Sequence, residues 1–179
     1  MTAPLDFSLT LYPEPILRHI AKPVAAFDAD LHAIVAAMYE RMRKSKGVGL
    51  AAPQVGLDQR ILVLNSTGEP EDDLTLVNPE IVARSGDPTL FDEGCLSFPG
   101  IYAEIRRPDR CTVRAFDIEG RPIQAEYSGF VSRIVQHEYD HLEGVLLVDR
   151  MSPTDKLRNR AALEELVARY KRAAPAKTR

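Results

Sequence analysis

The sequence predicts an α+β fold built mainly of antiparallel sheets, packed around a central helix and followed by a C-terminal helix. A hairpin pattern fills residues 111–127, and the helical patterns stand apart from the strands instead of alternating with them. A chain of 179 residues is also the size of one compact domain with its own core. We therefore expect a single domain over residues 1–172 and a disordered tail over residues 173–179, which contain a proline.

The N-terminal part is expected to hold an irregular arm and then a helix. Several prolines between residues 12 and 23 disfavour regular structure there. Asp28 and Asp30 are suited to cap a helix that runs to about Lys44. The apolar residues that recur at helical spacing form its predicted buried stripe. They are Leu31, Ile34, Val35, Met38 and Met42.

Short strands are predicted over residues 60–64, 74–77 and 81–83. The last two are separated by Asn78-Pro79, which predicts a break in the chain's extended course. Further on, residues 111–118 alternate between apolar and polar side chains, and Glu119-Gly120 turns the chain into residues 122–127. These features predict a β-hairpin.

Two more helices are expected after the hairpin. The first covers residues 130–142, with Phe130, Ile134 and Val135 near one face, and Gly144 follows it as a stop signal. The second covers residues 157–170 and offers an apolar face to the core. That face consists of Leu157, Ala161, Leu163, Leu166, Val167 and Tyr170.

Composition and charge exclude several classes of protein. The net charge of −3 argues against a general nucleic-acid binder, and the chain has no apolar run long enough to span a membrane. Residues 1–10 lack the pattern of a secretory signal, and two cysteines suit a reducing cytoplasm. Residues 152–179 carry eight basic and three acidic side chains. This excess is typical of a solvated helix face, and the alternative is a contact with an anionic partner such as ribosomal RNA.

The strongest chemical signal is the run His137-Glu138-Tyr139-Asp140-His141. Histidines four residues apart lie on one face of a helix, so both rings can reach a single ion. Glu138 stands between them, close enough to accept a proton from a metal-bound water. The pattern therefore predicts a hydrolytic metal site.

A catalytic ion needs a third protein ligand, and the sequence offers two sources. Upstream, Cys95 sits between a glycine and a short polar turn, and its thiolate is a strong ligand for zinc or ferrous iron. Downstream, Glu164 or Glu165 would serve in a peptidase of the zincin kind, whereas Leu147 occupies the position where a metzincin has its third histidine. Cys111 enters an alternating strand and is expected to be a buried hydrophobe.

A third segment, residues 47–56, is rich in glycine and alanine and carries Gln54 as an uncharged amide donor. Small residues let a backbone approach another chain closely. Together with Glu93 to Ser97 and Gln136 to His141, this segment makes the chain resemble peptide deformylase. That family has G-x-G-L-A-A-x-Q, E-G-C-L-S and Q-H-E-x-x-H segments in this order. The absence of long insertions makes the chain similar to the shorter bacterial type.

The resemblance implies an activity and a set of active residues. It implies removal of the formyl group from the N-terminal formylmethionine of newly made proteins, with release of formate. Cys95, His137 and His141 would bind one divalent ion, which is Fe(II) in cells by family precedent, while zinc and nickel forms also occur. Glu138 would act on the water, and the Gln54 side chain and the Leu96 N–H would hold the oxyanion together with the metal.

The resemblance also implies how the substrate is held. Gly49 would pair with the peptide backbone, and Val48, Phe130 and Ile134 would wall the methionine slot, with Arg133 at its rim. Phe130 and Ile134 equally suit a plain core. Asp140 and Glu93 are candidates to orient a ligand or an arginine such as Arg107, and simple salt bridges fit them equally.

One position departs from the family pattern. Several family members have an arginine shortly after the second segment, where this chain has Tyr102, with Arg106 and Arg107 a few residues on. The peptide contacts beyond methionine are therefore expected to differ.

The expected partner is a formylmethionyl nascent peptide in the cytoplasm, with no membrane and no DNA. Family members are known to dock on the ribosome through a C-terminal helix, and Lys156, Arg158 and Arg160 would serve here. Two other functions compete with deformylation. One is a zincin-like metallopeptidase, and the other is a structural metal-binding module closed by Cys111 as fourth ligand.

Overall fold

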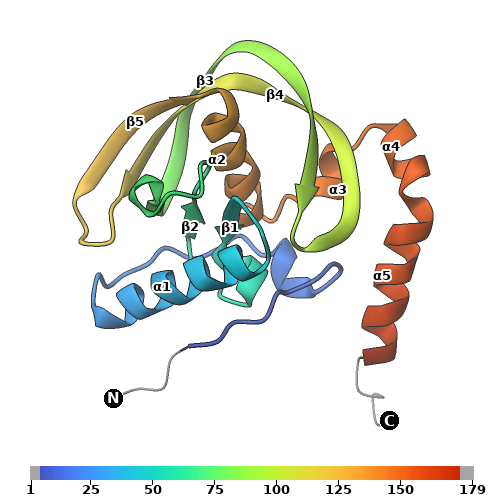
Figure 1. The fold of residues 1–179 in the computed structure, drawn as a ribbon, viewed down its shortest axis with the longest axis horizontal. Helices are drawn as coiled ribbons and strands as arrows, with labels where there is room; N and C mark the ends of the chain where they lie inside the picture. The colour runs from blue at the N-terminus through green and yellow to red at the C-terminus, as the bar shows by residue number, and fades with distance from the viewer. Residues whose placement is uncertain (1–4, 174–179) are drawn as a thin grey trace.

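The structure is a computed structural model that describes residues 5–173. These residues form a five-stranded antiparallel sheet, in the order β1-β2-β3-β4-β5, together with helices that include a C-terminal one (Figure 1). The α+β prediction is therefore confirmed. The helices are α1 (Ala29–Lys44), α2 (Gly129–Leu142), α3 (Leu147–Arg150), α4 (Pro153–Arg158) and α5 (Arg160–Ala173), with short 3₁₀ turns η1 (Pro15–Arg18), η2 (Ala52–Val55) and η3 (Pro70–Asp72). The strands are β1 (Gly49–Ala51), β2 (Ile61–Leu64), β3 (Leu74–Cys95), β4 (Phe98–Phe116) and β5 (Pro122–Ser128).

Helix α1 forms where the sequence predicts it. A side-chain oxygen of Asp28 accepts hydrogen bonds from the backbone N–H groups of Asp30 and Leu31, both at 3.1 Å, which caps the helix start. Most of the predicted stripe is buried, and Ile34 packs against it at the edge. The helix thus joins the core below β1 and β2 (Figure 1).

The two strands predicted over residues 74–77 and 81–83 are parts of one long strand, β3. The interruption at Asn78-Pro79 is absorbed as a shift in the pairing of β3 with β4 between Val77 and Glu80. Asn78 takes a left-handed conformation with φ of 51°, and its side-chain amide bonds the backbone of Val24 at 2.7 and 2.9 Å. The turn chemistry of Asn78 therefore bends the strand without ending it.

Strand β4 begins at Phe98, well before the predicted hairpin at residue 111. Between Ile101 and Ile105 its side chains alternate between buried and exposed, as in any half-buried strand. Arg107 occupies the next inward position and is buried. A charged residue at a core position interrupts the apolar alternation, so the sequence pattern does not predict this part of β4.

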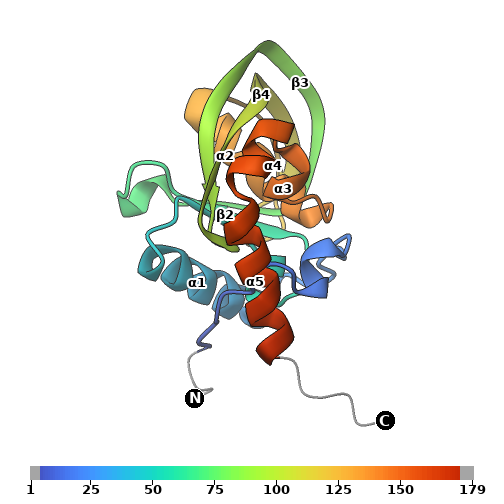
Figure 2. The same ribbon diagram turned by 90° about the vertical axis from the view of Figure 1, so that its right-hand side faces the viewer.

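The β3–β4 ribbon arches over helix α2, which lies beneath it in both views (Figures 1 and 2). Helix α2 also contacts β1, β2 and β5, so it stands at the centre of the fold. Its apolar side packs on the sheet through Ile134, Val135 and Leu142. This central helix carries the histidine pair, and Gly144 follows it with a positive φ of 68°, as a helix stop signal requires.

The predicted terminal helix over residues 157–170 is divided into α4 and α5 at Asn159. Leu157 is 73% exposed, so it does not belong to the apolar face, and Ala161 is exposed as well. Leu166 is buried beside Leu163 and packs against apolar residues of β4 such as Ile101 and Ile105. The Asn159 side chain donates to the carbonyl oxygen of Tyr102 at 2.9 Å, which fixes the break against the sheet.

Helix α5 lies at one end of the molecule and descends from the level of the arch to that of the N-terminal segment (Figures 1 and 2). Of the tail predicted as disordered, Ala173 is the last residue of α5, and residues 174–179 lie outside the described part. No helix within residues 5–173 is long and apolar enough to cross a membrane.

Candidate metal centre and active site

The structure brings Cys95, His137 and His141 together at the end of strand β3. The two histidines lie one turn apart on α2, with ring centroids 5.3 Å from each other. The Sγ atom of Cys95 lies 3.2 Å from Nε2 of His141, and one ligand atom from each residue lies within 4.8 Å of the others. One thiolate and two imidazoles are a donor set that suits zinc or ferrous iron and leaves an open coordination position.

The groups around these three residues also fit a bound ion. Glu138 is buried, and its Oε2 atom has no hydrogen-bond partner among residues 5–173. A buried carboxylate oxygen without a partner is costly unless a ligand or water meets it. Burial raises the pKa of Glu138 to about 7, because the protein interior disfavours its charged form.

The histidines have opposite surroundings. Burial lowers the pKa of His137, but hydrogen bonds with Cys95 and Glu93 outweigh burial and place it well above the ordinary value. Burial together with the charge of His137 holds the pKa of His141 well below its ordinary value. The Nδ1 atom of His137 lies 3.0 Å from Oε2 of Glu93, whereas Nδ1 of His141 has no partner among the described residues.

Glu93 is the most heavily bonded carboxylate of the site. Arg107 grips it with two N–H groups at 2.8 and 2.9 Å, and Arg133 donates to it at 2.7 Å. Burial raises the pKa of Glu93, yet the hydrogen bonds from His137 and Arg107 prevail and lower it to about 2. Glu93 is thus an anion that fixes the ring of His137.

Gln54 faces the cluster of Cys95, His137 and His141 from η2. Its Oε1 atom accepts a hydrogen bond from the backbone N–H of Ala51 at 2.8 Å, which fixes the orientation of the amide. Its Nε2 atom then points to Sγ of Cys95 at 3.5 Å and Oγ of Ser97 at 3.3 Å. Leu96 lies between these two residues, in the turn that joins β3 to β4.

A cavity of about 720 Å³ opens beside the cluster. Val48 and Phe130, at 41% and 44% exposure, stand at its mouth, and Ile134 lies buried deeper inside. Tyr102 lines the mouth as well and is 55% exposed. The cavity, two of the three candidate ligands (Cys95 and His137) and the buried carboxylate of Glu138 therefore form one continuous site.

The resemblance implies that Arg133 lies at the rim of the methionine slot, whereas the structure places it in the wall of the cavity. The residue is only 7% exposed. Its N–H groups are engaged by Glu93, by the carbonyl oxygen of Ile105 at 3.0 Å and by Thr89. Its guanidinium carbon lies 5.4 Å from the ring centroid of Phe91. Arg133 is therefore a fixed part of the wall, not a mobile surface group.

Backbone of β1 lies directly against Glu138. A Cβ atom placed on Gly49 would come 2.5 Å from Oε1 of Glu138 and 2.7 Å from Cγ2 of Ile134. A side chain at residue 49 would therefore have to displace the side chains of Glu138 and Ile134, and glycine avoids this overlap.

The other candidates from the sequence lie outside this site. Glu164 and Glu165 are exposed on α5, where they pair with Arg160 and Arg169. Cys111 is buried, and Oγ of Ser132 donates to its Sγ at 3.4 Å. No described contact joins these residues to the cluster of Cys95, His137 and His141.

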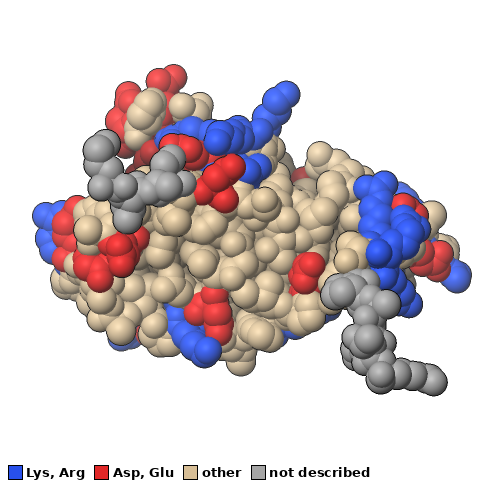
Figure 3. Space-filling view, turned by 90° about the horizontal axis from the view of Figure 1, so that it is seen from below, with Lys and Arg blue, Asp and Glu red and all other residues tan. Residues whose placement is uncertain are grey.

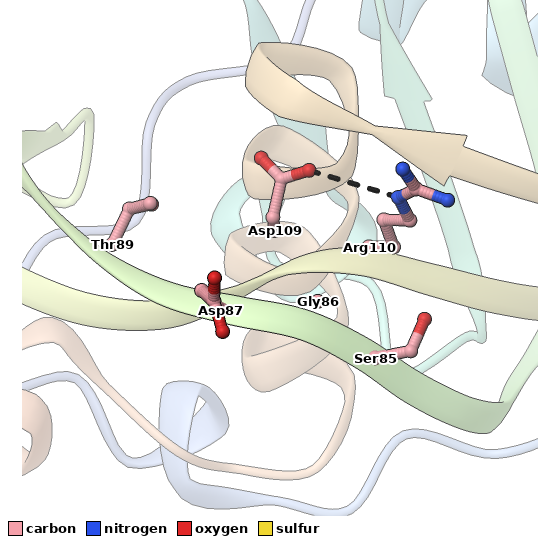
Figure 4. A pocket seen from close by; sticks show the side chains of 6 residues that line it. All are labelled: Ser85, Gly86, Asp87, Thr89, Asp109 and Arg110. Carbon is pink, nitrogen blue, oxygen red and sulfur yellow. Dashed lines mark ion pairs between the residues drawn. The ribbon is translucent and has the colours of Figure 1, made fainter.

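A second hollow lies on the outer side of the β3–β4 ribbon, where the pairing shifts between Ser85 and Pro88 (Figure 4). Asp109 and Arg110 face it and form an ion pair at 3.9 Å. Its residues are largely exposed, and it lies apart from the residues of the cavity beside Cys95. We regard it as a consequence of the bend in the ribbon.

The sequence analysis assigns no role to two residues that the structure places in or near the site. Ser97 lies within hydrogen-bond distance of Gln54, as its place in the second segment suggests. Arg150 reaches Asp140 from α3, at 2.6 and 3.0 Å. No sequence pattern links Arg150 to the histidine run, because the contact depends on how α3 packs.

Comparisons with known proteins agree with this geometry. The family model described as polypeptide deformylase matches residues 7–157. A peptide deformylase of Alkalilimnicola ehrlichii is 45% identical, and the match covers 89% of each chain. Peptide deformylase 1B of Arabidopsis thaliana is 48% identical over 89% of this chain, and the match covers 59% of that relative.

A solved structure gives the same result for the fold. The crystal structure of peptide deformylase from Plasmodium falciparum superposes with a TM-score of 0.91 at 40% identity, covering 94% of this chain and 99% of that one. Family model, relatives and structure agree over nearly all of the described residues. This chain belongs to the peptide deformylase family.

Proposed function

We propose that this chain hydrolyses the formyl group from the N-terminal formylmethionine of newly made proteins, with Cys95, His137 and His141 holding the metal ion. The observation that carries the proposal is the meeting of these three side chains, within 4.8 Å, beside a buried glutamate and an open cavity. Family membership supplies the reaction, and the geometry supports the assignment of residues.

The ion that we propose is Fe(II) in cells, with zinc or nickel possible in purified protein. A thiolate with two imidazoles suits each of these ions, so the choice of iron rests on the family. A divalent ion bound there supplies Lewis acidity, which acidifies water and polarises a carbonyl oxygen.

Glu138 is proposed as the group that moves protons. Its Oε2 atom has no hydrogen-bond partner among residues 5–173 and is buried beside the cavity. A carboxyl group with a pKa of about 7 both accepts and donates protons near neutral pH. Glu138 therefore takes the proton of the attacking water and delivers it to the nitrogen that leaves the formyl carbon.

Gln54 and the Leu96 N–H are proposed to stabilise the oxyanion that forms on the formyl group. Leu96 directly follows Cys95 in the chain, and the Gln54 amide lies 3.5 Å from Sγ of Cys95 and is already oriented by its bond with Ala51. Donors fixed in advance need not reorganise during the reaction, which is the main benefit of an oxyanion hole.

The cavity walls are proposed to select the methionine. Val48, Phe130 and Ile134 offer apolar surface, and Arg133 backs this wall with its guanidinium face over Phe91. Gly49 leaves the β1 edge without a side chain, so the peptide backbone can lie against it.

The structural metal-binding alternative finds no support in the geometry. It needs Cys111 as a fourth ligand. Cys111 instead contacts Ser132 within the core and does not join the three ligands. The metallopeptidase alternative needs a ligand from α5, and Glu164 and Glu165 are held by arginines on the surface.

Replacing each cysteine in turn tests the ligand assignment. Cys95→Ser is expected to lose most of its bound metal, because a neutral hydroxyl binds zinc or Fe(II) much more weakly than a thiolate does. Cys111→Ser is the matched control and should keep one ion per chain, measured by metal analysis after dialysis. A Cys95→Ser protein with full metal content would place the third ligand elsewhere and favour the peptidase reading.

We further propose that residues 1–172 act as one domain in the cytoplasm and that the basic face of α4 and α5 contacts the ribosome. Both cysteines are free thiols, in keeping with a reducing compartment. The substrate is a nascent chain, so an enzyme near the ribosome would meet it early.

A further inference from the structure

A series of ion pairs continues from Glu93 through buried Arg107 and Asp140 to Arg150, which is partly exposed. Arg107 uses two N–H groups on Glu93, and its Nη1 atom donates to Oδ2 of Asp140 at 2.8 Å. Arg150 then donates to both oxygens of Asp140, at 2.6 and 3.0 Å. The side chains of Glu93, Arg107 and Asp140 are all at least nine-tenths buried.

These ion pairs join four elements of the fold. Glu93 lies on β3, Arg107 on β4, Asp140 on α2 and Arg150 at the end of α3. At its inner end, Glu93 meets Nδ1 of His137 at 3.0 Å. The sequence of contacts therefore runs from the last residue of α3 to the outer nitrogen of a proposed metal ligand.

Each link restricts the next. The planar guanidinium of Arg107 has its fork on Glu93, so its orientation decides where that carboxylate lies. The third contact of Arg107 is Oδ2 of Asp140, and Arg150 holds both oxygens of the same carboxylate. Without Arg150, Asp140 would keep a single arginine and could turn away from it.

We propose that Arg150 is a positioning residue for the metal centre, acting through Asp140, Arg107 and Glu93 on the imidazole of His137. It touches neither the substrate cavity nor the metal ligands. The inference rests on the proposed role of His137 as a ligand. Outer partners of a ligating histidine fix its ring and leave Nε2 free for the ion, and their loss weakens metal binding about 10- to 100-fold.

Arg150→Gln tests the proposal because the arginine side chain is 43% exposed, so its removal leaves no large cavity. We expect the affinity for Zn(II), measured by competition with a chelator, to fall about 10-fold, the lower end for outer partners. The visible spectrum of the Co(II)-loaded protein should change as well. Arg150→Lys should recover part of the affinity, since it keeps the charge but loses the fork.

Arg18→Gln is the matched control. Arg18 is 44% exposed and pairs with Asp149, the residue before Arg150 in α3. Within residues 5–173, no hydrogen bond or ion pair leads from this pair to His137. Glu93→Gln, which alters the direct partner of His137, should weaken metal binding more than Arg150→Gln does. Arg18→Gln should leave Zn(II) affinity and the Co(II) spectrum unchanged.

Two results would overturn the proposal. One is an Arg150→Gln protein with the parent's affinity and spectrum. The other is an equal loss in Arg150→Gln and Arg18→Gln, which would mean that α3 stability alone is at work. His137→Ala separates this inference from the proposed site: if that variant keeps full Zn(II) affinity, the ligand assignment itself fails.

Discussion

Glu138 combines two properties that are rarely found together in a carboxyl group. It is buried, and one of its oxygens has no protein partner in the described part of the chain. Nearby carboxylates raise its pKa further, while His137 and Arg107 oppose them. These surroundings suit proton transfer near neutral pH, and they give a stable fold no evident benefit.

Removing this carboxylate should stop the reaction without emptying the site. We expect Glu138→Ala to lower kcat by at least ~10²-fold, the usual contribution of general acid–base catalysis. Metal content should stay at the parent's level, because Glu138 does not belong to the cluster of Cys95, His137 and His141. Steady-state kinetics on a formylated peptide at matched metal content would refute the role if turnover stayed within a few fold of the parent.

Single residues were partly predictable from the sequence. The spacing of His137 and His141 places both on one face of a helix, whatever surrounds it. Cys95 was one of two sources for a third ligand, and the fold brings it to the histidines. The burial of Arg133 and the reach of Arg150 depend on packing between distant elements, which spacing does not encode.

Among the elements, the contact of β1 with α2 decides the shape of the site. The Gly49 backbone lies where a Cβ atom would overlap both Glu138 and Ile134. The packing of Glu138 and Ile134 therefore favours glycine at this point of β1. The missing side chain also leaves room for a peptide along the strand.

Gly49→Ala should disturb this contact directly. The added methyl group fits only if the side chains of Glu138 and Ile134 move. We therefore expect Glu138 to be displaced and kcat to fall at least ~10-fold, as small misplacements of catalytic groups cause large losses. Kinetics should be compared with thermal unfolding of the same protein. Parent-like turnover would mean that β1 and α2 are less closely packed than the structure has them.

Helices α4 and α5 carry the basic residues for which a ribosome contact is proposed. Lys and Arg gather over this end of the molecule, while the surface between it and α1 shows few charges (Figure 3). Arg158 and Arg160 already pair with carboxylates of their own helices, Asp155 and Glu164. Such pairs are typical of a solvated face, whereas a ribosome contact would make binding depend on these basic residues.

Reversing the charge on this face distinguishes a ribosome contact from a solvated face. Replacement of Lys156, Arg158 and Arg160 by glutamate should abolish salt-sensitive cosedimentation with ribosomes. Reversal of three arginines on the β3–β4–β5 side (Arg84, Arg110 and Arg114) should leave it intact. Equal binding of both variants would show a solvated face.

Elements were predictable where local chemistry alone defines them. Helix α1 has its cap at Asp28 and its apolar stripe, and both were read correctly. The sequence does not predict the first half of β4, because Arg107 fills a core position there. It places Leu157 on the apolar face of one long helix, whereas the helix is interrupted at Asn159 and Leu157 is exposed. In both cases a tertiary contact overrides the local pattern.

At the scale of the whole molecule, the sheet and the central helix hold the site between them. Strand β3 brings Cys95 and Glu93, α2 brings the histidines and Glu138, and η2 brings Gln54. Each segment is distant from the others in sequence, and the arch of β3 and β4 over α2 makes them neighbours (Figure 1). The fold class was predictable because helical and strand patterns occupy separate parts of the sequence. The arch was not, because β3 and β4 extend well beyond the short apolar runs that predict strands.

The most direct measurement is mass analysis of a formyl-methionyl tripeptide incubated with protein purified anaerobically with Fe(II). Loss of the formyl group alone, with formate released in equal amount, is the expected result. Cleavage between residues would contradict deformylation and favour the metallopeptidase. An untouched peptide, with the metal still bound, would mean that this chain keeps the family's site without its activity.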